Sequence, residues 1–95
     1  MGTAARTRPK RLAAKLLQIR MGLELTQEEL IARLDCEGDL ARSNVTRFEQ
    51  GLREPSLLIL LRYARLANIS TDVLIDDDLA LPTKLPVGKN TRSRK

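Results

Sequence analysis

The sequence predicts an all-α fold of five short helices around one core. Apolar residues recur at spacings of three and four along most of the chain, as they do on one face of an amphipathic helix. Residues that cap or stop helices separate these stretches, and no stretch alternates apolar and polar residues as a strand does. With 95 residues the chain can bury one modest hydrophobic core, so we expect one small domain.

The first two helices have clear boundaries in the sequence. The first is expected over residues 10–21, ending near Gly22, and the second over residues 27–34. Thr26 and Glu29 form a capping box before the second helix, in which the hydroxyl and the carboxylate each accept a backbone N–H. The apolar residues expected to face the core are Leu12, Ala13, Leu16, Leu17, Ile19, Leu30, Ile31 and Leu34.

The third helix is expected to begin after Asp39, whose carboxylate can cap the first backbone N–H groups, and to end at Gln50. Gly51 would then stop the helix in the left-handed conformation, which glycine adopts without a steric penalty. At about 100° per residue along a helix, four side chains lie within about 60° of one another and form an inward face. These are Ala41, Val45, Phe48 and Leu52.

The fourth and fifth helices are expected to follow directly. The fourth should occupy residues 55–68, and Ser70 should cap a short fifth helix that continues toward Leu79 and stops before Pro82. The core faces of these helices are expected to carry Leu57, Leu60, Leu61, Ala64, Val73 and Leu74.

Composition disfavours several classes of function. The chain has no histidine and one cysteine, Cys36, so it lacks a His-based triad and the usual zinc ligands, and we expect no metal and no cofactor. No other set of acid, base and nucleophile is evident, which makes an enzyme the least favoured class. A lone cysteine forms no intrachain disulfide, and the run "LAAKLL" is too short for a membrane span, so we expect a cytoplasmic protein without membrane contact.

The net charge of +5 is distributed unevenly. Residues 1–11 and 82–95 contain nine basic residues and no acid, whereas residues 12–81 contain eight basic residues and all 12 acids. We therefore expect a basic flexible arm at residues 1–9, a folded domain at residues 10–81 and a basic flexible tail at residues 82–95. These ends are either solvated or contact phosphate groups.

Two segments and one pair of residues stand in a characteristic order. They are "LTQEEL" at residues 25–30, "VTRFEQGLREPSLLILLRYARLANIS" at residues 45–70, and Arg20 ahead of Gln27. In this order and spacing they resemble the Cro and lambda-repressor-like helix-turn-helix family, of the xenobiotic-response-element type, over roughly residues 12–74. The resemblance implies a compact five-helix domain that binds double-stranded DNA through a helix-turn-helix formed by the second and third helices.

The sequence departs from this family in the turn between those two helices. The four residues "CEGD" at residues 36–39 look inserted, and Ala41 stands where the family has a serine cap. Asp39 is therefore expected to replace that cap. Together with Asp35 and Glu37, it would bring three acids near the DNA face, where they would repel phosphate unless the turn points away.

The outer face of the third helix suits the edges of DNA bases. Opposite Val45 lie Ser43, Thr46, Arg47 and Gln50, flanked by Arg42 and Asn44. Arginine can bond guanine O6 and N7 as a fork, serine can take several partners, and threonine can also touch a thymine methyl group. An ordinary solvated helix face is the alternative interpretation.

The resemblance assigns roles to individual residues. It implies base contacts at Arg42, Ser43 and Arg47, with Thr46 as a further candidate, and phosphate contacts at Gln27, Asn44, Gln50 and Arg53. Gln27 is physically suited to this role, because a side-chain amide and the N–H groups at a helix N-terminus both favour an anion. Glu49 lies near the inward side of its helix, and the family pairs this position with an arginine of the first helix, here Arg20.

Several aliphatic residues fall outside the expected core faces of the last two helices. A second copy of the chain, another protein or the C-terminal tail could cover them. They are Leu58, Ile59, Leu66, Ile75 and Leu79. The sequence thus predicts a sequence-specific DNA-binding regulator, a repressor that binds a two-fold operator as a homodimer. The alternative is an antitoxin-like or adaptor module that uses the same fold to bind a protein partner.

Overall fold

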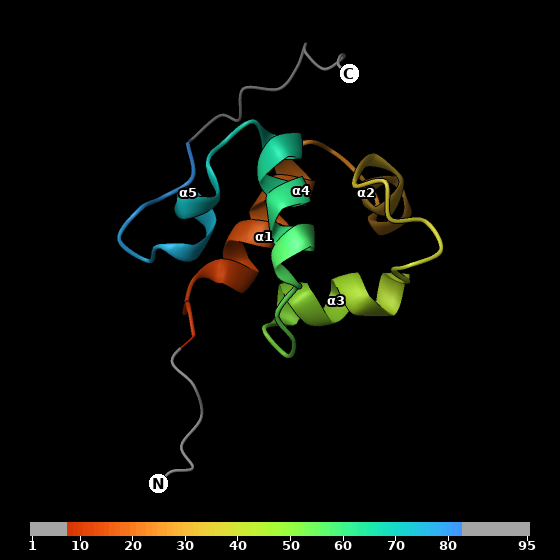
Figure 1. Ribbon diagram of the computed structural model, residues 1–95, viewed down its shortest axis with the longest axis horizontal. Coiled ribbons are helices and arrows are strands. Elements are labelled where there is room, and N and C mark those ends of the chain that lie inside the picture. The colour runs from red at the N-terminus through yellow and green to blue at the C-terminus, as the bar shows by residue number, and fades with distance from the viewer. Residues whose placement is uncertain (1–7, 83–95) are drawn as a thin grey trace, which may run out of the picture.

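The computed structural model describes residues 8–82, and these form five α-helices and no strand. The helices are α1 (Leu12–Gly22), α2 (Gln27–Arg33), α3 (Arg42–Gln50), α4 (Leu57–Ala67) and α5 (Thr71–Ile75). In Figure 1, α1 and α4 lie at the centre, α2 and α5 on opposite sides, and α3 along the lower edge. The predicted all-α fold is confirmed. Residues 1–7 and 83–95, to which most of the expected basic arm and tail belong, lie outside the described residues.

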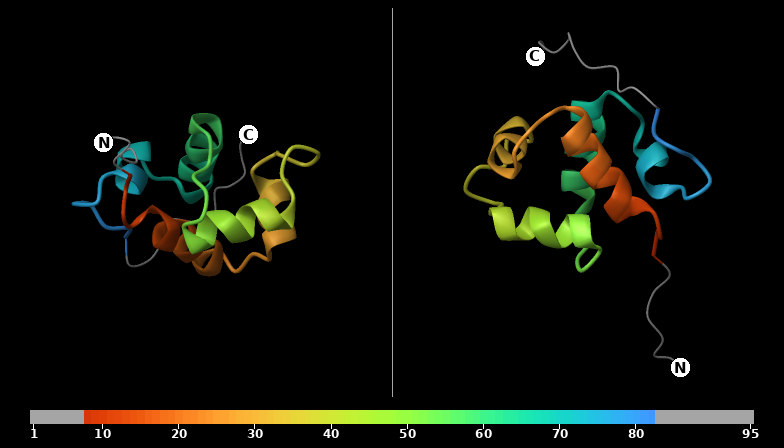
Figure 2. Two further views of the ribbon diagram at one scale, coloured as in Figure 1. Left: turned by 90° about the horizontal axis from the view of Figure 1, so that it is seen from below. Right: turned by 180° about the vertical axis from the view of Figure 1, so that it is seen from behind.

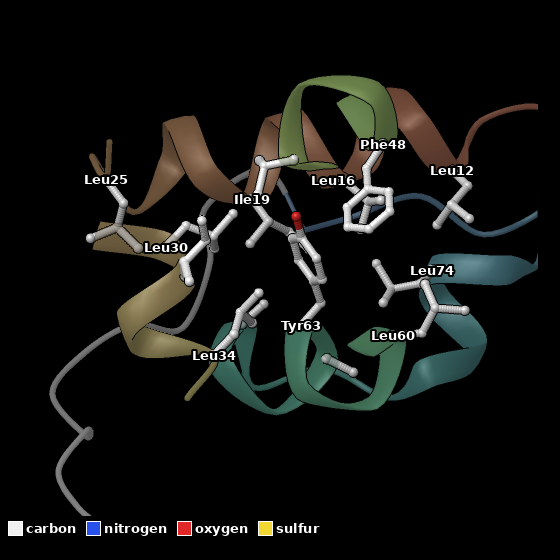
Figure 3. Close-up of a cluster of buried hydrophobic side chains, with 14 of the residues drawn as sticks. Leu12, Leu16, Ile19, Leu25, Leu30, Leu34, Phe48, Leu60, Tyr63 and Leu74 are labelled. Carbon is white, nitrogen blue, oxygen red and sulfur yellow. The ribbon is translucent and has the colours of Figure 1, made fainter. Parts of the chain in front are cut away.

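The hydrophobic core lies between α1, α3 and α4, and α2 and α5 close its two ends (Figure 3). Seen from behind in Figure 2, α1 runs diagonally across α4. Leu16 and Ile19 of α1 are fully buried, and Tyr63 of α4 meets them from the opposite side. The predicted apolar face of α1 is thus the central layer of the core, since spacings of three and four keep these side chains on one side.

Capping residues mark most of the helix ends as the sequence predicts, but the expectation that the Ser70 side chain caps α5 is wrong, because it makes no capping hydrogen bond. Thr26 and Glu29 make both bonds of the capping box before α2, at 3.1 and 2.9 Å. The Ser56 hydroxyl accepts an N–H from the first turn of α4 at 3.3 Å. Gly51 after α3 and Asn68 after α4 both have left-handed backbones, with φ of 76° and 59°. The ends of these helices therefore follow from local chemistry.

Four residues that were expected in the core are exposed instead. They are Leu17, Ala41, Leu52 and Leu57. Leu52 follows the left-handed Gly51, so helical angles no longer describe where its side chain points, and it is 69% exposed. Leu57 lies at the start of α4, where the buried face is carried by later residues, and it is 85% exposed. The buried face of α4 consists of Leu60, Tyr63, Ala64 and Ala67.

The fifth helix ends at Ile75 and does not reach Leu79, the expected limit. A buried lysine of α1 satisfies its last carbonyl groups. The Lys15 ammonium donates to the carbonyl oxygens of Val73 and Asp76, at 2.7 and 2.9 Å. Cations stabilise helix C-termini, where carbonyl groups lack partners and the helix dipole is negative. Burial lowers the pKa of Lys15.

Arg62 of α4 performs the same role at the C-terminus of α2. Its Nη1 donates to the carbonyl oxygens of Leu34 and Asp35, at 3.0 and 2.8 Å. The same nitrogen lies 3.7 Å from the sulfur of Cys36, whose side chain is buried and belongs to the core. These contacts attach the end of α2, and the turn that follows it, to α4.

The N-terminus of α1 is capped from beyond α5 by Asp77. Its carboxylate accepts the backbone N–H of Lys10, at 2.9 and 3.1 Å to its two oxygens, and that of Arg11 at 3.0 Å. The Arg11 guanidinium also donates to the Asp77 carbonyl oxygen at 2.7 Å. The backbone hydrogen bond from Lys10, and then that from Arg11, lowers the pKa of the Asp77 carboxyl below its usual range.

We expect Asp77→Asn to destabilise the domain at neutral pH and to have no effect in acid. Because the folded-state pKa is depressed, the ionised carboxylate stabilises the fold above the unfolded-state pKa of about 3.9. This contribution is lost as the pH falls through the lower folded-state value. Urea unfolding at a series of pH values should show the wild type converging on the variant in acid.

Asp78→Asn is the matched control for this prediction. The neighbouring Asp78 carboxylate accepts no hydrogen bond from any residue between 8 and 82, so its neutralisation should leave the pH profile unchanged. If the free energies of unfolding of the wild type and Asp77→Asn differed by the same amount at every pH, the assignment of Asp77 as the cap would be contradicted.

The hydroxyl group of Tyr63 is buried without a hydrogen-bond partner among the described residues. The side chain is fully buried, and its oxygen points toward α1 and α3 (Figure 3). Burial raises the pKa of this phenol, and the negative charge of Glu49 raises it further. A buried polar group without a partner costs about 1 to 3 kcal/mol of stability.

Tyr63→Phe is therefore expected to raise the free energy of unfolding by about 1 kcal/mol. The substitution keeps the packing of the ring and removes only the unpaired hydroxyl. Urea denaturation measures the change. Tyr63→Leu is the control, because it also removes the hydroxyl but loses ring contacts and should destabilise the fold. A less stable Tyr63→Phe protein would mean that the hydroxyl has a stabilising partner.

Candidate nucleic-acid interface

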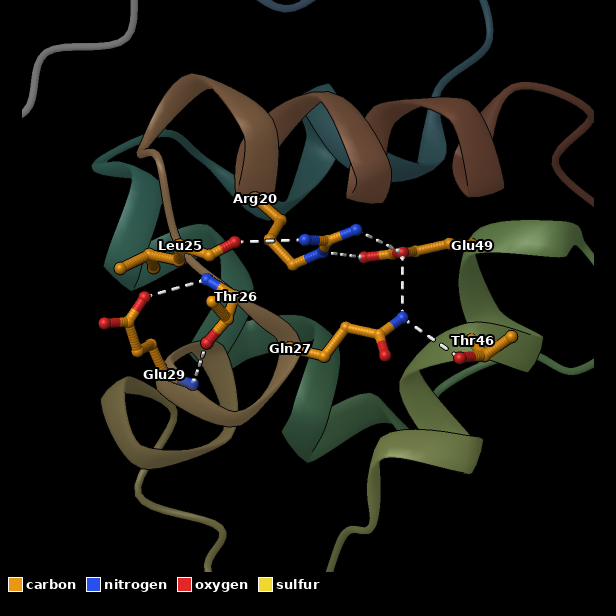
Figure 4. A network of polar contacts seen from close by, with 7 residues as sticks. All are labelled: Arg20, Leu25, Thr26, Gln27, Glu29, Thr46 and Glu49. Carbon is orange, nitrogen blue, oxygen red and sulfur yellow. Dashed lines mark hydrogen bonds and ion pairs between the residues drawn. The ribbon is translucent and has the colours of Figure 1, made fainter.

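The N-terminus of α2 lies beside the middle of α3 and is joined to it by side chains (Figure 4). The Gln27 amide nitrogen donates to the Thr46 hydroxyl oxygen at 3.0 Å and lies 3.5 Å from Glu49 Oε1. All three side chains are partly buried between the two helices. The first residue of α2 therefore has a fixed position relative to α3.

Arg20 of α1 and Glu49 of α3 form the expected ion pair. Arg20 Nε lies 2.7 Å from Glu49 Oε2, and Nη2 lies 3.1 Å from Oε1. The third nitrogen, Nη1, donates to the carbonyl oxygen of Leu25 at 3.0 Å. The side chains of Arg20 and Glu49 are 16% and 7% exposed. This two-bond pair is the strong type of arginine–carboxylate contact, and it connects α1, the loop before α2, and α3.

The Glu49 carboxylate determines how the Gln27 amide is oriented. An ionised carboxylate only accepts hydrogen bonds, so the amide nitrogen faces it and the amide oxygen points away. The Thr46 hydroxyl accepts from this nitrogen and keeps its own hydrogen for another acceptor. Thr46 can therefore donate to an acceptor outside the protein, whereas the Gln27 amide is already engaged.

The turn between α2 and α3 closes by itself and does not extend α3. The carbonyl oxygen of Cys36 accepts the N–H groups of Asp39 and Leu40, at 2.9 and 3.0 Å. Gly38 within this turn has a left-handed φ of 92°. Because the inserted residues form a separate turn, α3 begins at Arg42, and the expectation that Asp39 caps it is wrong.

Asn44 makes the capping contact of α3. Its side-chain oxygen accepts the backbone N–H of Ala41 at 2.8 Å. An alanine has no side-chain acceptor to return a bond to Asn44, so half of a capping box is made. The Asn44 amide nitrogen donates to no group in the described part of the chain. Asn44 thus fixes the start of α3 and still offers a donor on its surface.

The acids of the inserted turn do not lie across the outer face of α3. Asp35, Glu37 and Asp39 are all exposed. In Figure 1 the loop that carries them extends sideways beyond α2 and α3. This part of the chain therefore projects away from α2 and α3.

The outer face of α3 is open and basic. The side chains of Ser43, Arg47 and Gln50 are exposed and make no hydrogen bond to any described residue. Arg42 is exposed as well, with its Nε 3.9 Å from a carboxylate oxygen of Glu28, and both side chains are mostly in solvent. The predicted site residues therefore form two groups. Arg42, Ser43, Arg47, Gln50 and Arg53 are exposed, whereas Gln27, Asn44 and Thr46 are partly buried and bonded within the domain.

The arrangement of α2, the turn and α3 matches a known family. A family model described as helix-turn-helix, of the Cro/C1 type, covers residues 16–74, which run from α1 to α5. The chain belongs to this helix-turn-helix family. Comparisons with curated proteins and with solved structures gave no match.

Membership in the helix-turn-helix family makes this protein a DNA-binding regulator, with α2 and α3 as its helix-turn-helix. The family is one of regulators rather than enzymes. In residues 8–82, no group of His, Cys, Asp or Glu side chains could hold a metal ion. No helix in the same range is long and apolar enough to cross a membrane.

The expected association surface is only partly exposed in this helix-turn-helix protein. Leu58, Ile75 and Leu79 are 55%, 43% and 40% exposed. Ile59 and Leu66 lie outside the fully buried face of α4 but are partly buried and pack against the core, so little of their surface is available to a partner. Leu57, which was expected inside, instead adds to the exposed aliphatic surface next to Leu58.

Proposed function

We propose that the protein is a sequence-specific transcriptional repressor that places α3 in the major groove of its operator. The open outer face of α3 carries this proposal, because its donors lack partners within the described domain and match the acceptors on base edges. The proposed base contacts are Arg42, Ser43, Thr46 and Arg47. The protein would act in the cytoplasm, associated with the nucleoid through DNA binding, and repress by excluding polymerase from the occupied site.

Phosphate contacts on either side of α3 would fix its register in the groove. The first turn of α2 offers backbone N–H groups without helical partners, next to Gln27. The proposed phosphate contacts are Gln27, through its backbone N–H because its side-chain amide is engaged, and Asn44, Gln50 and Arg53. Such contacts set orientation and affinity but carry no direct sequence information.

We also propose that two copies bind together on a two-fold operator. The exposed leucines of α4 and the apolar residues near α5 support a self-complementary contact, as two-fold dimers require. Two recognition helices in one dimer read half-sites separated by about 10 base pairs. The surface would consist of Leu58, Ile75 and Leu79 with Leu57, bordered by Ile59 and Leu66.

Selection of bound duplexes from a random DNA pool tests the repressor proposal. We expect an enriched motif with two-fold symmetry, and a complex with two protein chains by sedimentation. Arg42→Ala combined with Arg47→Ala should abolish enrichment while the circular dichroism spectrum stays unchanged, because both side chains are exposed. Recovery of random sequences by the unaltered protein would contradict sequence-specific recognition.

A protein-interaction module of the antitoxin or adaptor type is the second candidate. The exposure of Leu57 and Leu58, at 85% and 55%, favours it, because adjacent exposed leucines suit a protein surface. Alanine substitutions on the two faces separate the proposals. If only the changes on α3 abolish binding of the protein to its target, the result supports DNA recognition. If only the changes at Leu57 and Leu58 abolish binding, the result supports the adaptor.

A further inference from the structure

We infer that Arg8 and Arg53 together bind one backbone phosphate of DNA, at a second anion site beside the end of the recognition helix. The inference rests on the proposed DNA-binding function and extends the interface beyond α2 and α3. It assigns a role to a residue ahead of α1 that lies outside the region matched by the family.

The site is an open hollow of about 440 Å³ between the start of the described chain and the loop from α3 to α4. Arg8 lines it on one side, and Arg53, Glu54 and Ser56 line it on the other. In Figure 1 the short segment ahead of α1 lies at the level of α3. Arg8 lines the same hollow as Leu52 and Arg53, which follow the C-terminal end of α3. Two arginine residues therefore border one hollow next to the proposed DNA face.

The contacts of Asp77 explain why the chain ahead of α1 takes this direction. Asp77 binds the backbone N–H groups of both Lys10 and Arg11, and its carbonyl oxygen accepts from the Arg11 side chain. These bonds hold the chain two residues away from Arg8. The approach of Arg8 to the α3–α4 loop is thus set by the fold, which reduces the entropy that Arg8 would lose on binding an anion.

The charges around the hollow favour replacement of the contact between Arg8 and Glu54 by a contact between Arg8 and a phosphate. Arg8 Nε lies 4.0 Å from Glu54 Oε2, at the limit of an ion pair, and the Arg8 side chain is 50% exposed. Arg53 is exposed and makes no hydrogen bond within the described chain. A phosphate between the two arginines could accept two-bond contacts from each guanidinium group, which are stronger than the single long contact to Glu54. The carboxylate of Glu54 would hold Arg8 near the site until DNA arrives.

A backbone phosphate fits this position better than a base. Gly51 turns the chain after α3, so the hollow lies beyond the end of the helix that would occupy the groove. The contact should therefore add affinity and salt dependence without changing sequence preference.

The experiment measures affinity for the selected operator over a range of salt concentrations. Arg8→Gln combined with Arg53→Gln should reduce the slope of log affinity against log salt by about 0.9, the value for one lost phosphate contact, and each single substitution should reduce the slope by part of that amount. Arg65→Gln removes the same charge from the far end of α4 and should leave the slope at the wild-type value. Ethylation interference should show one phosphate, flanking the half-site, whose modification weakens binding of the wild type but not binding of the protein that carries both Arg8→Gln and Arg53→Gln.

Each remaining outcome overturns a defined claim. An Arg8→Gln slope equal to those of the wild type and Arg65→Gln, with operator binding intact, overturns this site alone. A changed sequence preference for Arg8→Gln overturns its assignment to phosphate. Failure of the unaltered protein to bind any duplex overturns both this site and the proposed function. Circular dichroism of the variants should match the wild type, because Arg8 and Arg53 are surface residues.

Discussion

Glu49→Ala is expected to lower the free energy of unfolding by about 3 kcal/mol, the largest effect of any single polar substitution proposed for this domain. The substitution leaves the Arg20 guanidinium largely buried without its carboxylate, since this side chain is only 16% exposed. Leu25 still accepts from one nitrogen, and some water reaches the site, which places the effect at the lower end of the range for buried pairs. Urea unfolding of both proteins measures the difference.

The exposed pair between Arg42 and Glu28 provides the control. These side chains are 66% and 76% exposed and 3.9 Å apart, so Glu28→Ala should change stability by less than about 1 kcal/mol. A double-mutant cycle with Arg20→Ala isolates the coupling between Arg20 and Glu49. Equal, small effects of Glu49→Ala and Glu28→Ala would show that the buried pair does not hold α1 to α3.

The Arg20 and Glu49 pair shows what helical periodicity can predict. In the sequence, Glu49 lies near the inward side of its helix, where a carboxylate needs a partner, and the structure supplies Arg20 there. The outer face of α3 follows from the same geometry. Residues within one regular helix keep fixed angles to one another, so a burial pattern along that helix is accessible from sequence alone.

Contacts between distant parts of the chain could not be predicted in this way. Lys15 caps α5, Arg62 caps α2 and Asp77 caps α1, and each pair of partners is separated by at least 27 positions in the chain. A cation near a helix end can be predicted from the sequence as a cap only when it belongs to the same helix. In these three cases the capping side chain comes from another element, so only the packing of the helices brings it to the end that it caps.

The inserted turn is an intermediate case. The sequence places extra residues between α2 and α3, and the structure contains a separate turn there. Asp39 was a chemically reasonable cap, but Cys36 is drawn into the core and the turn closes on its carbonyl group. Burial of the one cysteine, which no local pattern signals, decides where α3 begins.

Arg47→Ala is expected to weaken binding to the preferred operator by about 1 to 3 kcal/mol and to relax the choice of base at one position. The Arg47 side chain is exposed on the outer face of α3 and makes no bond to a described residue, so its guanidinium can form a fork with a guanine. Affinity for operators with each base at each position measures both effects.

Arg53→Ala is the matched control for Arg47→Ala, because it removes an equally exposed arginine from the loop after α3. It should weaken all operators by a similar factor, since a phosphate contact does not distinguish bases. Arg42 is a less decisive test, because its Nε already lies 3.9 Å from Glu28 and its side chain can turn toward phosphate. If Arg47→Ala keeps the full sequence preference while the fold is intact, Arg47 does not read a base, and recognition by α3 would have to depend on Ser43 and Thr46.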